Sequence, residues 1–389
     1  MRIMFVLPRF PYPLDKGDKL RAYHQIRILS EYHEISLFCI SHEGVEPEHV
    51  DALRKYCTDI VVVKPNRLVS YKNVLRNFLR SKSLQIGYWD SKKARRKYKE
   101  FENKVQPDVI YSQMVRTMPI VSRRTLPKVM DFQDALSMNT ERRMDHTRPG
   151  FWHWVLHYEF KMLRSSEYNA FKIFDDLVII SETDSEAIPH RKNSDIKVIP
   201  NGVDFEYYAP MECEKKYEVM FCGNMQYEPN VNAAKYLVEE IMPIVWKHYP
   251  NARLLIAGTS PKASVKNLAN DRVEVSGWVE DMRECYASAQ VFVAPMQMGS
   301  GLQNKLLEAM SMELPCVTTP IANDSLGSNN EVLVGHDAQE IADDIIKLLS
   351  DENYRNQLAH KGREFIKQNY SWEVYGRKLE SILENVCKK

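Results

Sequence analysis

No stretch of this 389-residue chain stays apolar for the roughly 18 to 20 residues that a membrane span requires. The first apolar run, residues 2–7, is also too short for the hydrophobic region of a secretory signal. The seven cysteines are scattered, without a CxxC pair or a histidine-rich spacing. This disfavours a structural zinc site and predicts reduced thiols in a cytoplasmic protein. No GxGxxG turn follows the first run, where LPRFPYP stands instead, which disfavours a nicotinamide-dependent oxidoreductase.

The net charge of +1 hides an asymmetry between the two parts of the chain. Residues 1–200 hold 34 lysines and arginines against 25 acidic residues, whereas the remainder holds 19 against 27. Much of the excess lies in residues 67–104, where apolar side chains alternate with twelve bases. This segment fits either contact with an anionic membrane or a solvated helix packed on its own domain. Gly-rich binding motifs are absent and the whole chain is nearly neutral, so we expect no nucleic-acid partner.

Short β-branched runs alternate with longer helical patterns from end to end. Strands are expected at residues 2–7, 35–40, 59–63, 108–112, 128–132, 176–181 and 196–200, and again at 217–223, 252–258, 272–277, 290–295, 315–319 and 331–335. Apolar strands separated by helices indicate parallel sheets covered on both faces. We therefore predict an α/β protein of two doubly wound domains, residues 1–205 and 206–370, with a hinge near residue 210. Ligands of such sheets bind beyond the carboxyl ends of the strands, which directs attention to the loops that follow them.

The loop after the first strand is rich in proline and contains Gly17. We expect Asp18 to cap a helix that starts at Lys19. Exposed amides at that helix start, with Lys16, Lys19 and Arg21 nearby, would suit a phosphate or another anion. An ordinary capped turn with solvated bases is the alternative.

Two carboxylates, Asp131 and Asp134, lie at the end of the strand expected at residues 128–132. Asp131 can still belong to the strand, so Asp134 is the better candidate to project into a cleft as a general base or orienting group. Helix capping is the alternative for this pair. Asp175 and Asp176 precede a strand, on the side away from the ligand edge, so we expect no metal site there.

Three glycine turns follow strands of the second domain, at Gly223–Asn224, Gly258 and Gly277. Backbone groups in such turns can read a planar base through hydrogen bonds. The stretch GSGLQNKLLEAM then joins a strand to an amphipathic helix. Its loop amides and helix dipole would suit a diphosphate, with Lys305 as counter-charge. Glu308 is placed to bind a pair of vicinal hydroxyls, as a single carboxylate does on ribose in dinucleotide folds.

Four segments together resemble one family. They are PYPLDKGDKLRAY, VIPNGVDFEYYAP, FCGNMQYEPNVNAA and APMQMGSGLQNKLLEAMSMELPCVTT. Over essentially its whole length the chain resembles the retaining glycosyltransferases of the GT-B fold, family 4 (glycosyl transferases group 1), and within them the bacterial enzymes that build exopolysaccharide or lipid-linked oligosaccharide. The resemblance implies two Rossmann-like domains facing a central cleft. It also implies an acceptor-binding N-terminal domain, a C-terminal domain that binds the nucleotide sugar, and a final helix, residues 371–389, that packs back on the first domain.

The resemblance also assigns residues. Glu308 matches the second glutamate of the family's Glu-x7-Glu motif, which holds the ribose hydroxyls, whereas the first glutamate would fall at Ser300. The donor-binding positions that it implies are Gly17, Asn224, Gly277, Val279, Gly299, Ser300, Gly301, Leu302 and Glu308. Many members carry an arginine and a lysine where this chain has Asn224 and Asn230. The charge that stabilises the leaving group would therefore come from Lys305, from helix amides or from the bases Lys16, Lys19 and Arg21.

We predict a metal-independent hexosyltransferase that moves a sugar from a UDP- or GDP-linked donor to a glycan or lipid-linked acceptor, with retention at the anomeric carbon. Lys305 and Asp134 are the predicted catalytic residues, and no cofactor besides the nucleotide-sugar co-substrate is expected. Two rivals stay open: a GT-B sugar-nucleotide 2-epimerase, which needs no acceptor, and an inactive nucleotide-sugar-binding protein. We expect a cytoplasmic location, peripheral to the inner face of the plasma membrane if the basic segment contacts lipid.

Overall fold

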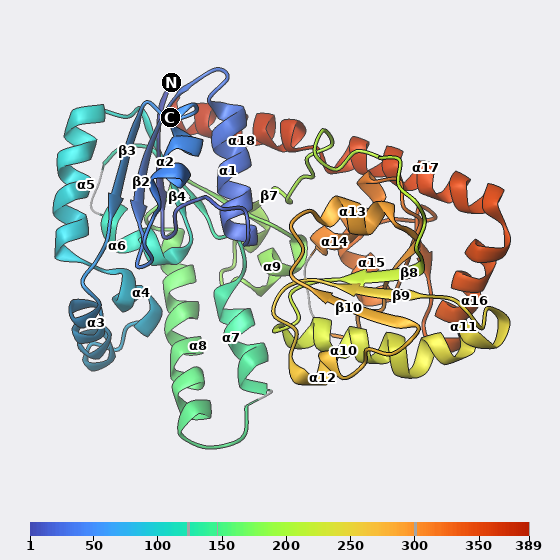
Figure 1. The fold of residues 1–389 in the computed structure, drawn as a ribbon. Coiled ribbons are helices and arrows are strands. Elements are labelled where there is room, and N and C mark those ends of the chain that lie inside the picture. Colours follow the sequence, from blue (N-terminus) through green and yellow to red (C-terminus); the bar gives the residue numbers. More distant parts are fainter. Residues whose placement is uncertain (123–124, 146, 299–301, 389) are drawn as a thin grey trace. The chain divides into compact units, whose positions relative to one another are not determined.

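The computed structural model describes residues 1–122, 125–145, 147–298 and 302–388 (Figure 1). The chain forms two compact units: unit 1 contains Met1–Pro200 and Trp372–Lys389, and unit 2 contains Asn201–Ser371. The division falls a few residues before the boundary expected at residue 205. Arg21 gives a physical reason, because its guanidinium donates to the carbonyls of Ile199 and Pro200 and holds them in unit 1.

Unit 1 is built around a sheet of seven parallel strands in the order β3-β2-β1-β4-β5-β6-β7. The strands are β1 (Arg2–Leu7), β2 (Glu34–Ile40), β3 (Asp59–Val63), β4 (Val109–Gln113), β5 (Lys128–Asp131), β6 (Asp176–Ile179) and β7 (Lys197–Val198). The chain order reverses between β1 and β4. Their carboxyl ends therefore form the topological switch point of this sheet.

The helices of unit 1 cover both faces of its sheet (Figure 1). They are α1 (Gly17–Leu29), α2 (Pro47–Arg54), α3 (Arg67–Leu79), α4 (Leu84–Trp89), α5 (Lys92–Val105), α6 (Met118–Val121), α7 (Leu136–Asp145), α8 (Phe151–Ala170), α9 (Glu182–Ala187) and α18 (Trp372–Cys387), with 3-10 turns at Val115–Thr117 and Asn193–Asp195. Although α18 comes last in the chain, it packs along α1. Trp372 stacks on His24 with ring centroids 4.7 Å apart, and Gly376 lies so close to Ile28 that a Cβ would come within 2.5 Å of it.

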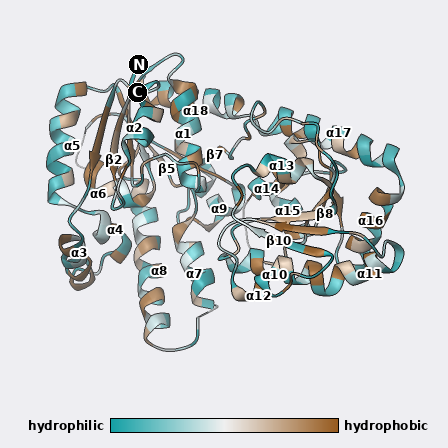
Figure 2. Cartoon of the chain, viewed as in Figure 1, coloured by the Kyte–Doolittle hydropathy of each residue, from teal (hydrophilic) through white to brown (hydrophobic). Residues whose placement is uncertain are grey.

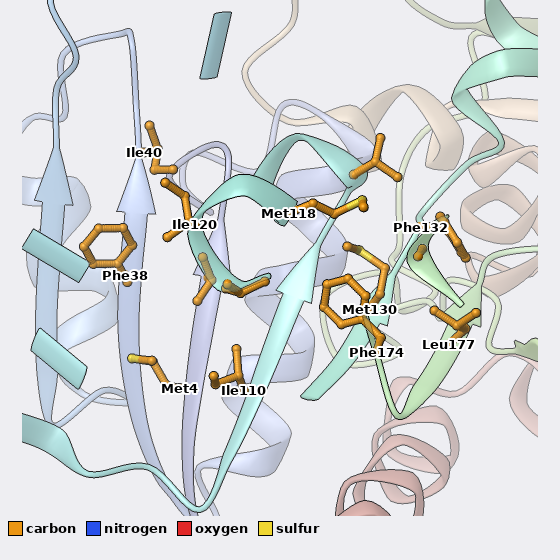
Figure 3. Packing of buried hydrophobic residues seen from close by; sticks show 14 of the residues in the cluster. Met4, Phe38, Ile40, Ile110, Met118, Ile120, Met130, Phe132, Phe174 and Leu177 are labelled. Carbon is orange, nitrogen blue, oxygen red and sulfur yellow. The ribbon is translucent and has the colours of Figure 1, made fainter. Parts of the chain in front are cut away.

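Alternate residues of neighbouring strands point to one face of the sheet and form the core of unit 1 (Figure 3). Met4, Phe38, Ile110 and Met130 come from four consecutive strands of the sheet and are fully buried. Ile120 of α6 packs over them. Strands that are buried on both faces explain why the sequence shows continuous apolar runs rather than alternation.

Unit 2 contains a sheet of six parallel strands in the order β10-β9-β8-β11-β12-β13. The strands are β8 (Tyr217–Cys222), β9 (Leu254–Ala257), β10 (Val273–Gly277), β11 (Ala289–Ala294), β12 (Cys316–Thr318) and β13 (Leu333–Val334). The helices are α10 (Glu228–Tyr236), α11 (Met242–His248), α12 (Ala263–Lys266), α13 (Met282–Ala287), α14 (Asn304–Ser311), α15 (Pro320–Leu326), α16 (Ala338–Ser350) and α17 (Glu352–Asn369). The switch point of this sheet lies between β8 and β11.

Every strand expected from the sequence is present and parallel, which confirms the prediction of two doubly wound α/β units. A π-helical turn at Leu237–Ile241 separates α10 from α11. Pro243 explains the break, because it cannot donate a backbone hydrogen bond to the preceding turn. The basic segment forms α3, α4 and α5. Among the described residues, no helix combines the length and apolar character needed to cross a bilayer.

Candidate functional site

The candidate site of unit 2 lies where β8 and β11 end, at the switch point of the sheet. Gly223 and Asn224 follow β8, and the segment after β11 leads through Leu302 to α14. Because ligands of open α/β sheets bind at this place, the loops chosen from the sequence lie at the appropriate edge. The predicted contacts Gly299, Ser300 and Gly301 lie outside the described residues.

Lys305, in the first turn of α14, provides a positive charge at this edge. Its ammonium donates to Oδ1 of Asn230 at 2.5 Å and lies 5.0 Å from the ring centroid of Phe221. Burial lowers the pKa of Lys305 to about 8, although Cys222 and Glu308 nearby act in the opposite direction. The ammonium is thus charged at neutral pH while being poorly solvated, which suits it to bind an anion.

The strand-end glycines allow two loops to meet through their backbones. A Cβ on Gly223 would lie 2.7 Å from the side-chain nitrogen of Asn230, and a Cβ on Gly258 would lie 1.9 Å from the carbonyl oxygen of Gly223. Asn230 in turn donates to the carbonyl of Asn224 at 3.0 Å. The loops after β8 and β9 are therefore closely packed, and Asn230 connects them to Lys305.

Glu308 lies three residues after Lys305, on the same face of α14. Its carboxyl group accepts a hydrogen bond from the hydroxyl of Tyr286 at 2.8 Å and another from Tyr208. Burial raises the pKa of Glu308 to about 7, while the two tyrosines and Lys305 oppose the rise. Neither tyrosine is among the residues predicted from the sequence. Tyr208 lies in the motif VIPNGVDFEYYAP, but nothing in that motif indicates contact with a glutamate a hundred residues later.

Gly277 ends β10 with a φ of +71°, and its carbonyl accepts a hydrogen bond from Gly258 at 3.0 Å. Val279 follows two residues later and lines a cavity of about 430 Å³. The other residues that line the cavity are Tyr207, Glu280, Asp281, Glu284 and Cys285. A planar group in this cavity would have backbone, aromatic and carboxylate partners.

In unit 1, the loop after β1 leads into α1, which begins at Gly17 with Lys16 as its N-cap residue. The carboxylate of Asp18 lies within the first turn and accepts a hydrogen bond from Arg9 at 2.8 Å. The expected cap by Asp18 is therefore wrong, because that side chain is used to hold the proline-rich loop onto the helix.

The three bases predicted to meet an anion all have acidic partners within unit 1: Lys16 with Glu43 at 3.8 Å, Lys19 with Asp15 at 2.8 Å, and Arg21 with Asp131 at 2.6 Å. Arg21 and Asp131 are fully buried. Asp131 also accepts hydrogen bonds from the hydroxyl of Tyr111 and from the amide of Gln133. Contrary to the expectation that it faces an anion, Arg21 is a structural group that joins α1 to the end of β5.

Asp134 follows the turn that Asp131 holds in place. Burial, together with the carboxylates of Asp184, Asp18 and Asp131, raises the pKa of Asp134 to about 7. No described residue donates a hydrogen bond to its carboxylate. Asp134 is therefore an acid at the carboxyl end of β5 that can exchange a proton near neutral pH.

A second cavity, of about 420 Å³, lies beyond the carboxyl ends of β1 and β2. Its lining includes Lys19 from the predicted set and several residues that sequence analysis missed, among them Arg9, Tyr12, His42, Tyr88 and Trp89. The rings of His42 and Tyr88 lie 4.2 Å apart, and Trp89 donates to the carbonyl of Pro8 at 2.9 Å. Burial lowers the pKa of His42, which favours its neutral form. The cavity thus presents aromatic rings together with polar groups.

The structure brings Asn224, Asn230, Lys305 and Glu308 to one edge of unit 2, whereas Lys19 and Asp134 lie at the corresponding edge of unit 1. Within the described ranges, no three histidine, cysteine, aspartate or glutamate side chains are grouped as ligands for a metal ion.

Residues 216–351, all within unit 2, match the family model described as glycosyl transferases group 1. An uncharacterized 44.6 kDa protein in the cps region of Klebsiella pneumoniae is 21% identical over 386 residues, which cover 95% of this chain and 96% of that protein. The capsular polysaccharide biosynthesis glycosyltransferase CapM of Staphylococcus aureus is 26% identical over 270 residues, with coverage of 60% and 70%.

A solved structure of the Anabaena protein HepE in complex with UDP and glucose has the same fold. It aligns with a TM-score of 0.68 and 15% sequence identity over 99% of this chain and 100% of that chain. At this identity the likeness concerns the fold alone. Two parallel-sheet, Rossmann-like units of the GT-B type are thus common to both proteins.

Proposed function

We propose that the chain is a glycosyl transferase of group 1 that moves a hexose-type sugar from a UDP- or GDP-linked donor to a glycan or lipid-linked acceptor. The anomeric configuration is retained in this proposal. Unit 2 binds the donor and unit 1 binds the acceptor.

The observation that carries the proposal is the pairing of Lys305 and Glu308 on one face of α14. A nucleoside diphosphate needs positive charge and amide donors for its phosphates and a hydrogen-bond acceptor for the vicinal ribose hydroxyls. Lys305 and the first turn of α14 supply the positive charge and the amide donors for the phosphates. Glu308 supplies the acceptor for the ribose hydroxyls. Val279 and Gly277 then flank the base, with the cavity beside Val279 as its place.

The proposed reaction breaks the bond between the anomeric carbon and the donor phosphate. The acceptor hydroxyl attacks from the leaving-group side and forms the new glycosidic bond, and its proton passes to an oxygen of the departing diphosphate. Lys305 and the amides before it stabilise the negative charge that develops on this leaving group. No step requires a metal ion.

On the acceptor side, we assign Asp134 as the group that orients or assists the acceptor hydroxyl. Its unpaired carboxyl and its pKa of about 7 support this assignment. The aromatic cavity at the ends of β1 and β2 supports saccharide binding, since its rings and polar groups match the two kinds of surface on a sugar.

The relatives support a role in cell-surface polysaccharide synthesis, because one is named for capsular polysaccharide biosynthesis and another is encoded in a cps region. Such a role suits a cytoplasmic protein that works at the inner face of the plasma membrane.

The test is a thermal-unfolding panel with UDP, GDP, ADP and their sugar conjugates, run on the wild type and on Glu308→Gln. A nucleotide present at a hundred times its Kd stabilises the folded state by about 2.7 kcal/mol. We expect one base to stabilise the wild type and the variant to respond much less. If no nucleotide shifts the unfolding temperature, the proposed function is wrong.

Product analysis with the labelled donor separates the remaining alternatives. Transfer predicts release of nucleoside diphosphate that depends on an acceptor fraction. An epimerase would convert the donor sugar without an acceptor, and a binding protein would show stabilisation without any turnover.

A further inference from the structure

Helix α3 is amphipathic, but it buries its polar side and exposes its apolar side. The side chains that it buries are polar, namely Ser70, Asn73 and Asn77. Its large apolar side chains are exposed: Leu68 by 72%, Leu75 by 60% and Leu79 by 75%, together with Tyr71 and Phe78. A helix of a globular protein ordinarily buries its apolar side, so an outward apolar side implies something else that covers it.

Specific hydrogen bonds hold α3 in this orientation. Asn73 donates to the carbonyl of Asp90 at 2.6 Å, and Asn77 donates to the carbonyl of Ser83 at 2.9 Å. Gly87 of α4 fits against Asn77 so closely that a Cβ would lie 2.8 Å from its side-chain nitrogen. Rotating α3 to bury its leucines would break these contacts, so the exposed apolar side is built into the fold.

The beginning of α8 extends this surface with aromatic rings. Phe151, Trp152 and Trp154 are exposed by 68%, 70% and 50%. A chain of ring contacts joins them to α3, since Phe78 lies 5.9 Å from Trp154, and Phe151 lies 6.3 Å from Trp154 and 5.5 Å from Trp152. Figure 2 shows the hydrophobic colouring on α3 and α8. We define the α3–α8 face as Leu68, Tyr71, Leu75, Phe78, Leu79, Phe151, Trp152 and Trp154.

The helices that carry this face are fixed to one another. Tyr158 of α8 donates to the carbonyls of Phe78 and Lys82 at the end of α3. The buried carboxylate of Glu159 accepts hydrogen bonds from Ser83 at 2.6 Å and from the amide of Leu84 at 2.7 Å, at the start of α4. The α3–α8 face is therefore a preformed surface.

A basic cavity of about 490 Å³ lies at the end of α3, where its lining residues Asn77 and Arg80 flank Phe78 and Leu79 of the face in the chain. It is lined by residues from the end of α3, α4, α5 and α8, and its bases are Arg76, Arg80, Lys82 and Arg95. Asp90 pairs with Arg76 and Arg95, whereas no described acidic residue pairs with Arg80 or Lys82. The sequence from residue 67 to residue 89 contains no acidic residue at all. The cavity thus has two positive charges to offer to an anion beside an apolar surface.

We propose that the α3–α8 face docks on a bilayer that contains anionic phospholipid, with Arg80 and Lys82 binding a lipid phosphate. Tryptophan and tyrosine are enriched at membrane interfaces, and clustered bases are attracted to anionic headgroups. The combination of apolar rings with a cavity in which Arg80 and Lys82 have no acidic partner among the described residues matches that surface better than it matches a protein partner. The inference deepens the proposed function, on which it rests for the use of a lipid-linked acceptor.

The test is flotation of the full chain with vesicles of phosphatidylcholine, with and without phosphatidylglycerol, at low salt. We expect strong binding to the anionic vesicles, weak binding to the neutral ones, and release as the salt concentration rises. The double variant Arg80→Gln, Lys82→Gln should lower the partition coefficient by about 30-fold, because each base near the surface contributes about 1 kcal/mol. Lys266→Gln with Lys361→Gln, two exposed lysines of unit 2, changes the net charge equally and should bind as the wild type does.

A second pair of variants tests the apolar part. Trp152→Ala should lower binding to anionic vesicles by about tenfold, whereas Tyr32→Ala, an exposed aromatic residue outside the α3–α8 face, should leave vesicle binding unchanged. Each variant is first compared with the wild type in thermal unfolding with and without nucleotide. An intact nucleotide response shows that the donor site is unaffected, so a failure of membrane binding is distinguishable from a failure of the proposed function.

Three results would overturn the proposal. One is that the wild type does not bind anionic vesicles at low salt. Another is that each test variant binds these vesicles as well as its matched control does. The protein could also form a dimer in the absence of lipid that Trp152→Ala dissociates, which would assign the α3–α8 face to a second copy of the chain.

Discussion

The ammonium of Lys305 lies 2.5 Å from the side-chain oxygen of Asn230, so that α14 and α10 share one hydrogen bond at the carboxyl edge of the unit 2 sheet. The resemblance implies a lysine at the position of Asn230. In this chain the ammonium of Lys305 lies beside that asparagine instead.

This relationship predicts a severe catalytic defect in Lys305→Met. Removing a preformed protein group that stabilises the charge on a leaving group typically lowers kcat by about 10²- to 10³-fold. We expect this loss in nucleoside diphosphate release under saturating donor, with little change in folding. Lys361→Met, at an exposed site on α17, is the matched control. The exchange variant Lys305→Asn, Asn230→Lys should recover part of the activity, and an unchanged kcat in Lys305→Met would refute the role.

Tyr286→Phe tests the hydrogen bond that holds Glu308. The variant removes a donor from the carboxyl group, which favours its protonated form and weakens its contact with ribose hydroxyls. We expect nucleotide affinity to fall by about tenfold, as a hydrogen bond to a charged group contributes about 1.5 kcal/mol or more. Isothermal titration with the preferred nucleotide measures this change. Tyr217→Phe is a suitable control, because it removes a hydroxyl that donates to Glu274 at 2.6 Å in the same unit. Equal losses in both variants would contradict the prediction.

The sequence predicts the fold well because its strands are buried on both faces. Continuous β-branched runs between helical segments are sufficient to locate them and to identify the two units. Lys305 and Glu308 could also be found, because a strand, a glycine turn and a helix start are visible in consecutive residues.

Contacts between distant residues could not be predicted in this way. Tyr286 and Glu308 lie on different helices, and no local pattern places a tyrosine hydroxyl against that carboxyl. The sequence predicts that Arg21 meets an anion, because it lies near the helix start after the proline-rich loop, yet its partner is Asp131 on β5. In α3, helical periodicity identifies an apolar side but does not decide which side faces the protein. The asparagines decide it, through carbonyls supplied by α4 and its flanking turns.

Because Arg21 and Asp131 form a buried pair, we predict that replacing Arg21 destabilises the protein much more than replacing an exposed arginine does. Arg21→Met leaves the Asp131 carboxylate buried without its partner, which should destabilise the protein by about 3 to 5 kcal/mol. Arg2→Met removes a solvent-exposed partner of Asp108 at 3.1 Å and should cost less than about 1 kcal/mol. Urea unfolding of both variants provides the comparison. Similar losses in the two variants would show that Arg21 contributes no more than a surface pair.

Asp134 predicts a pH dependence of both stability and activity. Its pKa is about 7 in the folded protein, against an ordinary value of 3.8, so the folded state holds the proton more tightly than the unfolded chain does. Stability should therefore fall as the pH rises from about 4 to 7, by up to about 4 kcal/mol from this group. Asp134→Asn should lose that part of the slope and be more stable than the wild type at pH 8, whereas Asp145→Asn, at an exposed site of α7, should follow the wild-type curve.

The same group should give the transfer rate an inflection near pH 7 that disappears in Asp134→Asn, because only the wild type can gain and lose a proton at this position. Initial rates between pH 5 and 9, with saturating donor and acceptor, measure it. If the variant keeps both the wild-type rate and the inflection, Asp134 does not assist the acceptor hydroxyl. If Asp134→Asn lowers the transfer rate and also changes the stability curve as expected, Asp134 has both roles. The effect on stability requires only that the acid is buried, whereas the effect on rate requires contact with the acceptor.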